Sequence, residues 1–344
     1  KNDDDYIVDR DFLGTASRLN CYNGCFNVFT GPLGVLASCC RLRNDAKETR
    51  QYMNSFGAGG VSIGSHRVVT INLPRIAYES EDTETYMKKL EYTITVAQDI
   101  LDIHRSLLVD VISRGRLPLY KHGIMDLKKQ FSTIGFIGAN EACEILGMDI
   151  TTEEGSQFVR DILNKMDTMN KSRTIVDGHI RNIEQIPGES TAPMFAKKDK
   201  LLYDHHYKMY ANQYIPLWKN VDIHQRIRAQ GQFDSLCSGG AILHANVNES
   251  LTPEQMQAII EYSAKCGVIY MGINIVQVRC NSCGKLFIGK FDKSPCHDAD
   301  VTHYLRVVGF LTPVSNWNSD RRKEYPTRQI YSNGQLSVDS FEAA

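Results

Sequence analysis

The sequence predicts an α/β fold, either an α/β barrel or an open α/β sheet, and three observations lead to it. Short apolar runs that suit buried strands alternate with longer stretches of helical periodicity. Within residues 241–278, a strand, a helix and a second strand follow one another at the spacing of a parallel βαβ unit. With 344 residues, of which 42% are hydrophobic, the chain can build a large core.

The first elements are expected in order from the N-terminus. Residues 1–11 are polar and acidic, and we expect a surface lead-in there. Residues 67–73 form a buried strand that ends at Pro74, because proline cannot donate to a sheet ladder. Residues 83–114 carry apolar side chains at helical spacing and therefore predict one long amphipathic helix.

The middle of the chain repeats the alternation. Residues 132–138 predict another apolar strand, and a helix follows from about Asn140. Residues 151–171 open with Thr-Thr-Glu-Glu, which supplies an N-cap and acidic first-turn residues, so they predict a further helix.

The βαβ unit has the clearest local signals. Residues 241–245 predict its first strand and residues 268–278 its second. The helix between them carries an N-cap, a first-position proline, a capping-box glutamine and a terminal glycine: Thr252, Pro253, Gln255 and Gly267.

Composition limits the function classes. The net charge of −1 gives no electrostatic reason to expect nucleic-acid or membrane binding. No apolar run approaches the roughly 18 residues of a membrane helix, and no signal peptide opens the sequence. Ten cysteines without a secretory signal fit a reducing compartment, where thiols serve metal or catalytic roles. We therefore expect a cytoplasmic protein.

The segment around Gly309 is the most informative part of the chain. A glycine here interrupts β-branched and aromatic residues, which usually marks a bulge or a close approach of another backbone or a ligand. The α-carbon of glycine is unhindered, and a radical on it is delocalised between the flanking amides. Gly309 could therefore store a radical on the protein.

Several segments together resemble one family, and they occur in its order. Residues 306–318 (RVVGFLTPVSNWN) are similar to the radical-bearing loop of the anaerobic, class III ribonucleotide reductases, which are glycyl radical enzymes. The other four segments are residues 38–42 (SCCRL), 69–76 (VTINLPRI), 133–147 (TIGFIGANEACEILG) and 184–203 (EQIPGESTAPMFAKKDKLLY). The resemblance spans about Cys21 to Tyr325.

The resemblance implies an architecture. It predicts part of a ten-stranded α/β barrel over residues 1–277, with a finger loop near Cys40, and a zinc-binding and glycyl radical segment over residues 278–344. In the family the cysteine loop lies near the middle of a longer chain. We therefore expect the 344 residues to be the catalytic C-terminal half, inactive without the missing N-terminal half or a second chain.

Cys40 is the candidate for a transient thiyl radical. On residue type alone a buried structural cysteine is the commoner interpretation. The resemblance assigns the thiyl role to the loop, and the position next to Arg41 favours Cys40 over Cys39. An S–H bond is comparable in strength to the ribose 3′ C–H bond, so hydrogen abstraction would be nearly thermoneutral and reversible.

Asn72 and Glu189 are the other candidate catalytic residues. Asn72 lies in an apolar strand, where its amide must find a partner; a local backbone bond competes with the ribose-hydroxyl contact that the resemblance implies. Glu189 follows Pro-Gly in a loop and could simply be solvated. The resemblance instead gives its carboxylate proton transfer during loss of the 2′-hydroxyl as water.

Cys280 and Cys283 form a Cys-x2-Cys pair that is typical of half a zinc knuckle. The family closes this site with a second Cys-x2-Cys, but here only Cys296 is present. The positions three residues before and after it, where its partner cysteine would stand, are Lys293 and Ala299. We expect a structural zinc whose fourth ligand is His297, with His303, Asp298 or a partner's residue left open.

The resemblance also implies partners and a reaction. We expect ribonucleoside triphosphates to be reduced in a homo-oligomer, after a radical-SAM activase with an iron–sulfur cluster installs the Gly309 radical. Formate or a thiol system would supply electrons. Two alternatives stay open: a pyruvate formate-lyase-type glycyl radical enzyme, some of which use neighbouring cysteines, and a catalytically silent fragment.

Overall fold

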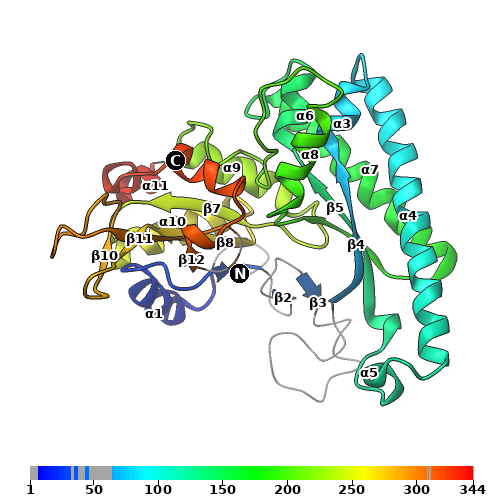
Figure 1. Ribbon diagram of the computed structural model, residues 1–344, viewed down its shortest axis with the longest axis horizontal. Coiled ribbons are helices and arrows are strands. Elements are labelled where there is room, and N and C mark those ends of the chain that lie inside the picture. Colours follow the sequence, from blue (N-terminus) through cyan, green and yellow to red (C-terminus); the bar gives the residue numbers. More distant parts are fainter. Residues whose placement is uncertain are drawn as a thin grey trace. The chain divides into compact units, whose positions relative to one another are not determined.

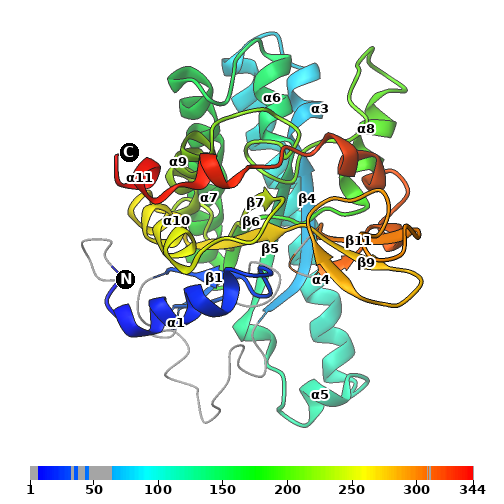
Figure 2. The same cartoon turned by 90° about the vertical axis from the view of Figure 1, so that its left-hand side faces the viewer.

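A computed structural model describes residues 7–31, 35–37, 43–45, 64–307, 309 and 311–343, with the backbone alone for 35–37 and 43–45. The chain forms two compact units. Unit 1 comprises Lys1–Leu33, Pro187–Gln232 and Ile242–Ala344, and unit 2 comprises Gly34–Ile186 and Phe233–Ala241. Both combine helices with sheets (Figures 1 and 2), which confirms the α/β class. None of the helices in the described ranges has the length and apolar character needed to cross a membrane.

Unit 2 is built on a three-stranded parallel sheet. Its strands are β4 (Gly64–Asn72), β5 (Gln130–Ile137) and β6 (Arg181–Gln185), in the order β4-β5-β6. The remaining elements of the unit are β2 (Val35–Ala37), β3 (Arg43–Asp45), α3 (Leu73–Tyr78), α4 (Thr83–Ser113), α5 (Pro118–Lys121), α6 (Ala139–Ile145), α7 (Glu153–Asp177) and a 3₁₀ helix at Leu127–Lys129.

Two long helices cover this parallel sheet. Helix α4 packs on β4 and β5, α7 packs on β6, and the two helices contact each other (Figure 1). Leu90, Ile94 and Leu101 of α4 are fully buried, in agreement with the helical spacing of the sequence. The predicted helices are confirmed, although α7 continues to Asp177, beyond its predicted end at Lys171, and Thr152 is the N-cap of α7.

Unit 1 contains the predicted βαβ unit. Strand β7 (Leu243–Val247) pairs in parallel with β8 (Tyr270–Ile275), and α10 (Pro253–Lys265) connects them. The capping box of Thr252 and Gln255 is present as predicted. Strand β1 (Val28–Phe29) adds to the other edge of β8 in the antiparallel direction.

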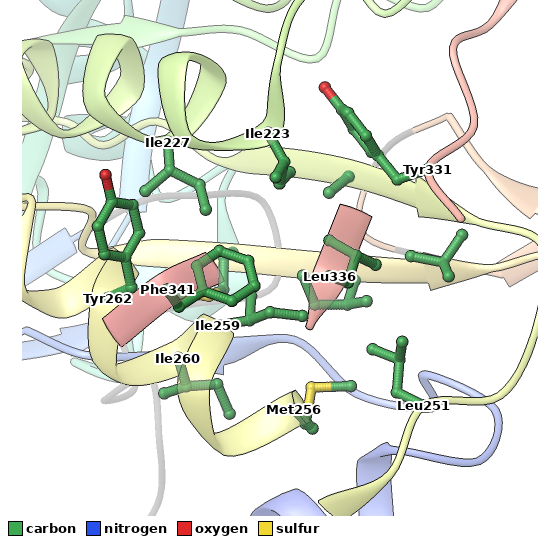
Figure 3. Close-up of a cluster of buried hydrophobic side chains, with 14 of the residues drawn as sticks. Ile223, Ile227, Leu251, Met256, Ile259, Ile260, Tyr262, Tyr331, Leu336 and Phe341 are labelled. Atoms are coloured by element: carbon green, nitrogen blue, oxygen red, sulfur yellow. The ribbon is translucent and has the colours of Figure 1, made fainter. Parts of the chain in front are cut away.

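The core of unit 1 lies where α9 (Ile223–Asp234), α10 and α11 (Val338–Glu342) approach the β7–β8 pair. Figure 3 shows the apolar side chains that meet there, among them Ile227, Ile259 and Phe341. Helix α1 (Arg10–Asn20) also packs on α10. It begins at Arg10, within the stretch that the sequence predicts as a surface lead-in. The remaining helices of the unit are α8 (Thr191–Asp199) and 3₁₀ helices at Val314–Asn316, Arg321–Thr327 and Asn333–Leu336.

A second, antiparallel sheet of unit 1 carries the C-terminal motifs. Its strand order is β10-β9-β11-β12. The strands are β9 (Gln277–Cys280), β10 (Leu286–Ile288), β11 (Val301–Arg306) and β12 (Leu311–Pro313). Val301 of β11 faces Cys280 of β9, and Arg306 at the far end of β11 faces Leu311 of β12.

The structure corrects one predicted element. Residues 268–278 were expected to form a single strand, but they form β8 and β9, which belong to different sheets. Val276, between them, is fully buried and its amide donates to the carbonyl of Val247 at 2.9 Å. The run hides a change of sheet because residues 268–278 are all buried, so burial shows no break at Val276.

Candidate active site and metal centre

Gly309 lies in the short connection between β11 and β12. The two strands pair as far as Arg306 and Leu311, and Gly309 lies between these paired ends. Gly309 is half-buried, and its carbonyl accepts a hydrogen bond from the side chain of Asn27 at 3.5 Å. The glycine therefore sits at the tip of a hairpin that another segment holds through its backbone.

Asn27 connects this hairpin to β8. Its Nδ2 donates both to the Gly309 carbonyl and to the Tyr270 hydroxyl, the latter at 3.1 Å. Space for the Asn27 side chain depends on Gly272, because a Cβ there would lie 2.7 Å from Asn27 Oδ1. A glycine in the middle of β8 is thus explained by the close approach of a side chain to the strand.

Arg306 is buried beneath the same hairpin, with 2% of its surface exposed. Its guanidinium donates to the carbonyl of Gly24 at 2.6 Å and to Asn274 Oδ1 at 3.4 Å. Within the described ranges it forms no ion pair with a carboxylate. Burial lowers its pKa, yet an arginine stays charged in proteins. The root of the hairpin is therefore a buried cation held by neutral oxygens.

Gly24 has the conformation that this contact requires. Its φ is +58°, a left-handed value that favours glycine. A Cβ at this position would come within 2.3 Å of the carbonyl of Ile273. The segment before β1 can therefore lie against β8 and offer its carbonyl to Arg306.

Four metal-binding side chains come together at the other end of the same sheet. The donor atoms of Cys280, Cys283, Cys296 and His297 all lie within 4.8 Å of one another. The Cys283 and Cys296 sulfurs are 3.6 Å apart, and His297 Nδ1 is 3.0 Å from the Cys296 sulfur and 3.9 Å from that of Cys280.

These separations fit a tetrahedral zinc ion. With Zn–S bonds of about 2.3 Å, two sulfurs of a tetrahedron lie about 3.8 Å apart. The hydroxyl of Ser294 and the backbone amide of Cys283 lower the pKa of the Cys280 thiol to about 6, which favours the thiolate that metals bind. Three sulfurs and one nitrogen thus form a coherent donor set.

His297 is the candidate fourth ligand that the structure brings into the cluster. His303, which the sequence left open, instead places its Nε2 3.0 Å from the carbonyl of Phe291. Asp298 lies outside the four-residue group and has a positive φ of 49°. The backbone of this loop turns sharply there, directly after His297.

The structure places Asn72 at the junction of β4 and α3. Its side chain accepts a hydrogen bond from the backbone amide of Arg75 at 3.3 Å and so caps α3. Strand β4 therefore ends one residue before the predicted boundary, and Pro74 belongs to the first turn of a helix. The local backbone bond that the sequence suggested is present.

Glu189 is exposed in the turn that precedes α8. Its neighbour Gly188 has a φ of +55°, and the Gly188 carbonyl accepts hydrogen bonds from the Ala192 amide and from Arg321. Asn212 donates to the carbonyl of Pro187 at 2.5 Å. The backbone before Glu189 is thus fixed by two side chains distant in sequence.

Cys39 and Cys40 lie outside the described residues.

The structure also reveals participants that the sequence analysis did not identify, namely Asn27, Tyr270 and a buried group of charges within residues 321–328. Asn27 carries no signal that separates it from a surface asparagine. The charged residues do carry a signal in the sequence, because Arg321, Glu324 and Arg328 are spaced three and four residues apart, as partners on one helical turn are.

Comparison with known proteins decides the family. The family model for anaerobic ribonucleoside-triphosphate reductase matches residues 2–331. The chain belongs to this family. Among curated relatives, the anaerobic ribonucleoside-triphosphate reductase of Haemophilus influenzae is 23% identical over 344 residues, covering 87% of this chain and 46% of the relative. The enzyme of Escherichia coli is 25% identical over 315 residues, covering 78% and 43%.

Solved structures of the family have the same fold. The anaerobic ribonucleotide reductase from Thermotoga maritima with glycerol in the active site is similar with a TM-score of 0.80 and 35% identity, over 93% of this chain and 54% of that one. The same enzyme in complex with dATP and CTP gives 0.79 and 34%, over 94% and 54%. The chain spans about half the length of the relatives it matches.

Proposed function

We propose that this chain carries the glycyl radical and the thiyl cysteine of an anaerobic ribonucleoside-triphosphate reductase. The observation that carries the proposal is the hairpin tip. Gly309 lies between β11 and β12, its carbonyl accepts a hydrogen bond from Asn27, and the buried Arg306 ends β11 before it. A radical stored on an α-carbon needs such a fixed, partly covered position, and membership of the family supports the assignment.

The proposed reaction separates storage from abstraction. A radical-SAM activase removes a hydrogen atom from the α-carbon of Gly309. The glycyl radical then takes the hydrogen of the Cys40 thiol, and the resulting thiyl radical takes the 3′ hydrogen of the ribonucleotide. Loss of the 2′-hydroxyl as water requires a proton, and the Glu189 carboxyl group is the proposed acid–base residue. Formate or a thiol system supplies the two electrons.

Asn72 has a proposed role in holding the ribose. Its Oδ1 caps α3, so the side chain is oriented by the helix at the end of β4. A side chain fixed in this way can present its amide to a ribose hydroxyl without first losing conformational freedom. The T. maritima relative was solved with dATP and CTP, which supports nucleotides as ligands of this chain too.

A structural zinc is proposed at Cys280, Cys283, Cys296 and His297. The ion would hold the loop before β11 against the end of β9, because Cys280 pairs with Val301 across the two strands. Strand β11 then leads directly to Gly309. In this way the metal would fasten the base of the hairpin that carries the radical.

Several larger features are part of the same proposal. The fold likeness to the T. maritima structures supports the assignment of the chain to a ten-stranded barrel of the glycyl radical enzyme type. We retain residues 1–277 as the catalytic part and residues 278–344 as the zinc and radical segment, and a homo-oligomer as the assembly. The family match favours a reductase over a pyruvate formate-lyase-type enzyme.

The two adjacent cysteines give a direct test of the radical pathway. Cys40→Ser should still accept the glycyl radical on anaerobic activation but form no deoxyribonucleotide. Cys39→Ser is the matched control and should retain most of the turnover. Both are assayed with the chain alone and with the polypeptide that corresponds to the unmatched half of the relatives. Loss of turnover in Cys39→Ser alone would move the thiyl role to Cys39. If the wild type also shows no turnover, with or without the second polypeptide, the result would favour a silent fragment.

A further inference from the structure

Unit 1 contains a buried ion triplet close to its C-terminus. Glu324 accepts hydrogen bonds from Arg321 through one carboxylate oxygen and from Arg328 Nε, at 2.8 Å, through the other. All three side chains have 1% or less of their surface exposed. The triplet carries a net positive charge inside the protein.

Burying such a triplet costs free energy of desolvation. Three charges lose their hydration, and well-packed apolar residues of the same size often stabilise a protein as well or better. Burial raises the pKa of Glu324, but the guanidinium groups of Arg328 and Arg321 outweigh it and hold the pKa below its ordinary value. The carboxylate is therefore charged and oriented, which suggests a task other than stability.

The donors of the two arginines that do not bind Glu324 contact two backbone carbonyls. Arg328 Nη1 donates to the carbonyl of Arg306 at 2.6 Å, and Arg321 Nη2 donates to the carbonyl of Gly188 at 3.3 Å. The Arg328 guanidinium also lies over the ring of Trp317, 4.7 Å from its centroid. Each guanidinium thus donates to Glu324 through one nitrogen and to a backbone carbonyl of another segment through a second nitrogen.

Both carbonyls lie next to residues of the proposed reaction. Arg306 precedes Gly309 by three residues at the end of β11, and Gly188 directly precedes Glu189. The side chain of Arg306 is fixed separately, by Gly24 and Asn274. One carboxylate therefore positions two guanidinium groups, and each guanidinium fixes the backbone of one functional loop.

We propose that Arg321, Glu324 and Arg328 are positioning residues that align the Gly309 hairpin with the Glu189 turn. The proposal rests on the reductase function proposed above. None of the three side chains touches the reacting atoms, so their effect passes through the two carbonyls. Arg328 serves radical storage, Arg321 serves the acid–base step that follows abstraction, and Glu324 couples the two.

This division of roles separates positioning from simple stabilisation. A residue that only stabilises the fold would lower the amount of folded protein and leave radicals per folded polypeptide and product per radical unchanged. The two arginine variants should instead each lower one of these readouts. Arg328→Lys should lower the number of glycyl radicals per folded polypeptide several-fold, because lysine keeps the charge but cannot bridge Glu324 and Arg306 with a planar fork.

Arg321→Lys should have the complementary effect. Its radical content should match wild type, while deoxyribonucleotide formed per radical falls about tenfold or more, since a misaligned catalytic group commonly costs about that much in rate. Glu324→Gln should lower both quantities, because it loosens both arginines. Arg322→Lys is the matched control, since Arg322 lies in the same segment with its side chain exposed, and both readouts should stay at wild-type values.

The experiment uses the reductase preparation of the cysteine test, activated anaerobically, with radicals counted by electron paramagnetic resonance and product by chromatography. Radicals are expressed per folded polypeptide, and product is expressed per radical. If the lysine variants fold poorly, Trp317→Phe leaves the triplet intact and weakens the stacking under Arg328, so it should lower radical content alone. Arginine variants that match Arg322→Lys in both readouts, or that lower radicals per folded polypeptide and product per radical by the same factor, would overturn the proposal. A wild-type protein without radical would overturn the proposed function itself, and this proposal with it.

Discussion

The parallel sheet of unit 2 and the Gly309 hairpin of unit 1 are held in different ways. Around β4, β5 and β6, apolar side chains of α4 and α7 fill the space, with Ile134 and Ile162 fully buried. Around the hairpin, the decisive contacts are polar: the Asn27 bond, the buried Arg306 and the Arg–Glu–Arg triplet.

This difference separates two kinds of order. Apolar packing is tolerant, because many side chains share the energy and each can be replaced by another of similar volume. Polar contacts are directional, so each fixes the position of a particular carbonyl and costs free energy when one partner is removed. The region proposed to hold the radical uses the directional kind, whereas the parallel sheet relies chiefly on packing.

Removal of the proposed metal should give the largest effect, and only in unit 1. Cys283→Ser, or a chelator, should destabilise the β10-β9-β11-β12 sheet by roughly 5 kcal/mol or more, since structural zinc supplies folding free energy directly. Hydrogen exchange would show faster exchange in β9 and β11 with unchanged protection in β4, β5 and β6. Cys266→Ser, a thiol outside the cluster, is the control. Less than about one zinc per chain in the purified wild type would count against the site.

A cavity in unit 2 should give the next largest effect, and it should not change the chemistry directly. Leu90 is fully buried on α4, so Leu90→Ala should cost about 2–5 kcal/mol of unfolding free energy. Tyr92→Ala on the same helix is the control, because Tyr92 is 73% exposed and exposed positions change stability by about 0.5 kcal/mol or less. Urea denaturation measures both. Equal costs for the two variants would contradict the packing assigned to α4.

Acid should give the smallest effect, through His66 in unit 2. Burial, with Arg105, His104, His179 and Arg181 nearby, lowers the pKa of His66 from 6.5 to about 4. The unfolded chain therefore binds this proton more readily, so the contribution of His66 to stability is complete above pH 6.5 and is lost as pH falls towards 4. Because the ring is only half-buried, we expect a loss of roughly 1–2 kcal/mol.

His66→Gln should flatten this pH dependence. Urea denaturation of the two proteins at pH 7 and pH 4.5 measures the difference. A wild-type protein whose loss of stability over this interval matches that of His66→Gln would show that the half-buried imidazole is not its source.

Much of the fold was predictable because local signals agreed with the final packing. The capping box at Thr252 and Gln255, the helical spacing along α4 and the parallel β7–β8 pair all follow from the sequence and are confirmed. The exception is the run 268–278, which is buried throughout although its residues belong to strands of two different sheets. Periodicity reports burial, and it does not report which sheet a strand joins.

The site was predictable only in part. The cysteine spacing predicted a metal site, and the structure brings Cys280, Cys283, Cys296 and His297 together. The Gly309 segment was among those that predicted the family, which the family model confirms. The supporting contacts were not predictable, because Asn27 and Gly309 are far apart in sequence and meet only in the folded chain. A charged run such as residues 321–328 is usually solvated, and only the structure shows that Glu324 is buried.

The location of the radical is the central claim, and spectroscopy of the activated protein tests it most directly. After anaerobic activation, electron paramagnetic resonance should show a doublet, because the unpaired electron couples to the single remaining α-hydrogen of Gly309. Protein grown with glycine deuterated at the α-carbon should give a collapsed line, and exposure to oxygen should cut the chain at residue 309. A signal that persists in Gly309→Ala, or a doublet unchanged by deuteration, would contradict the account.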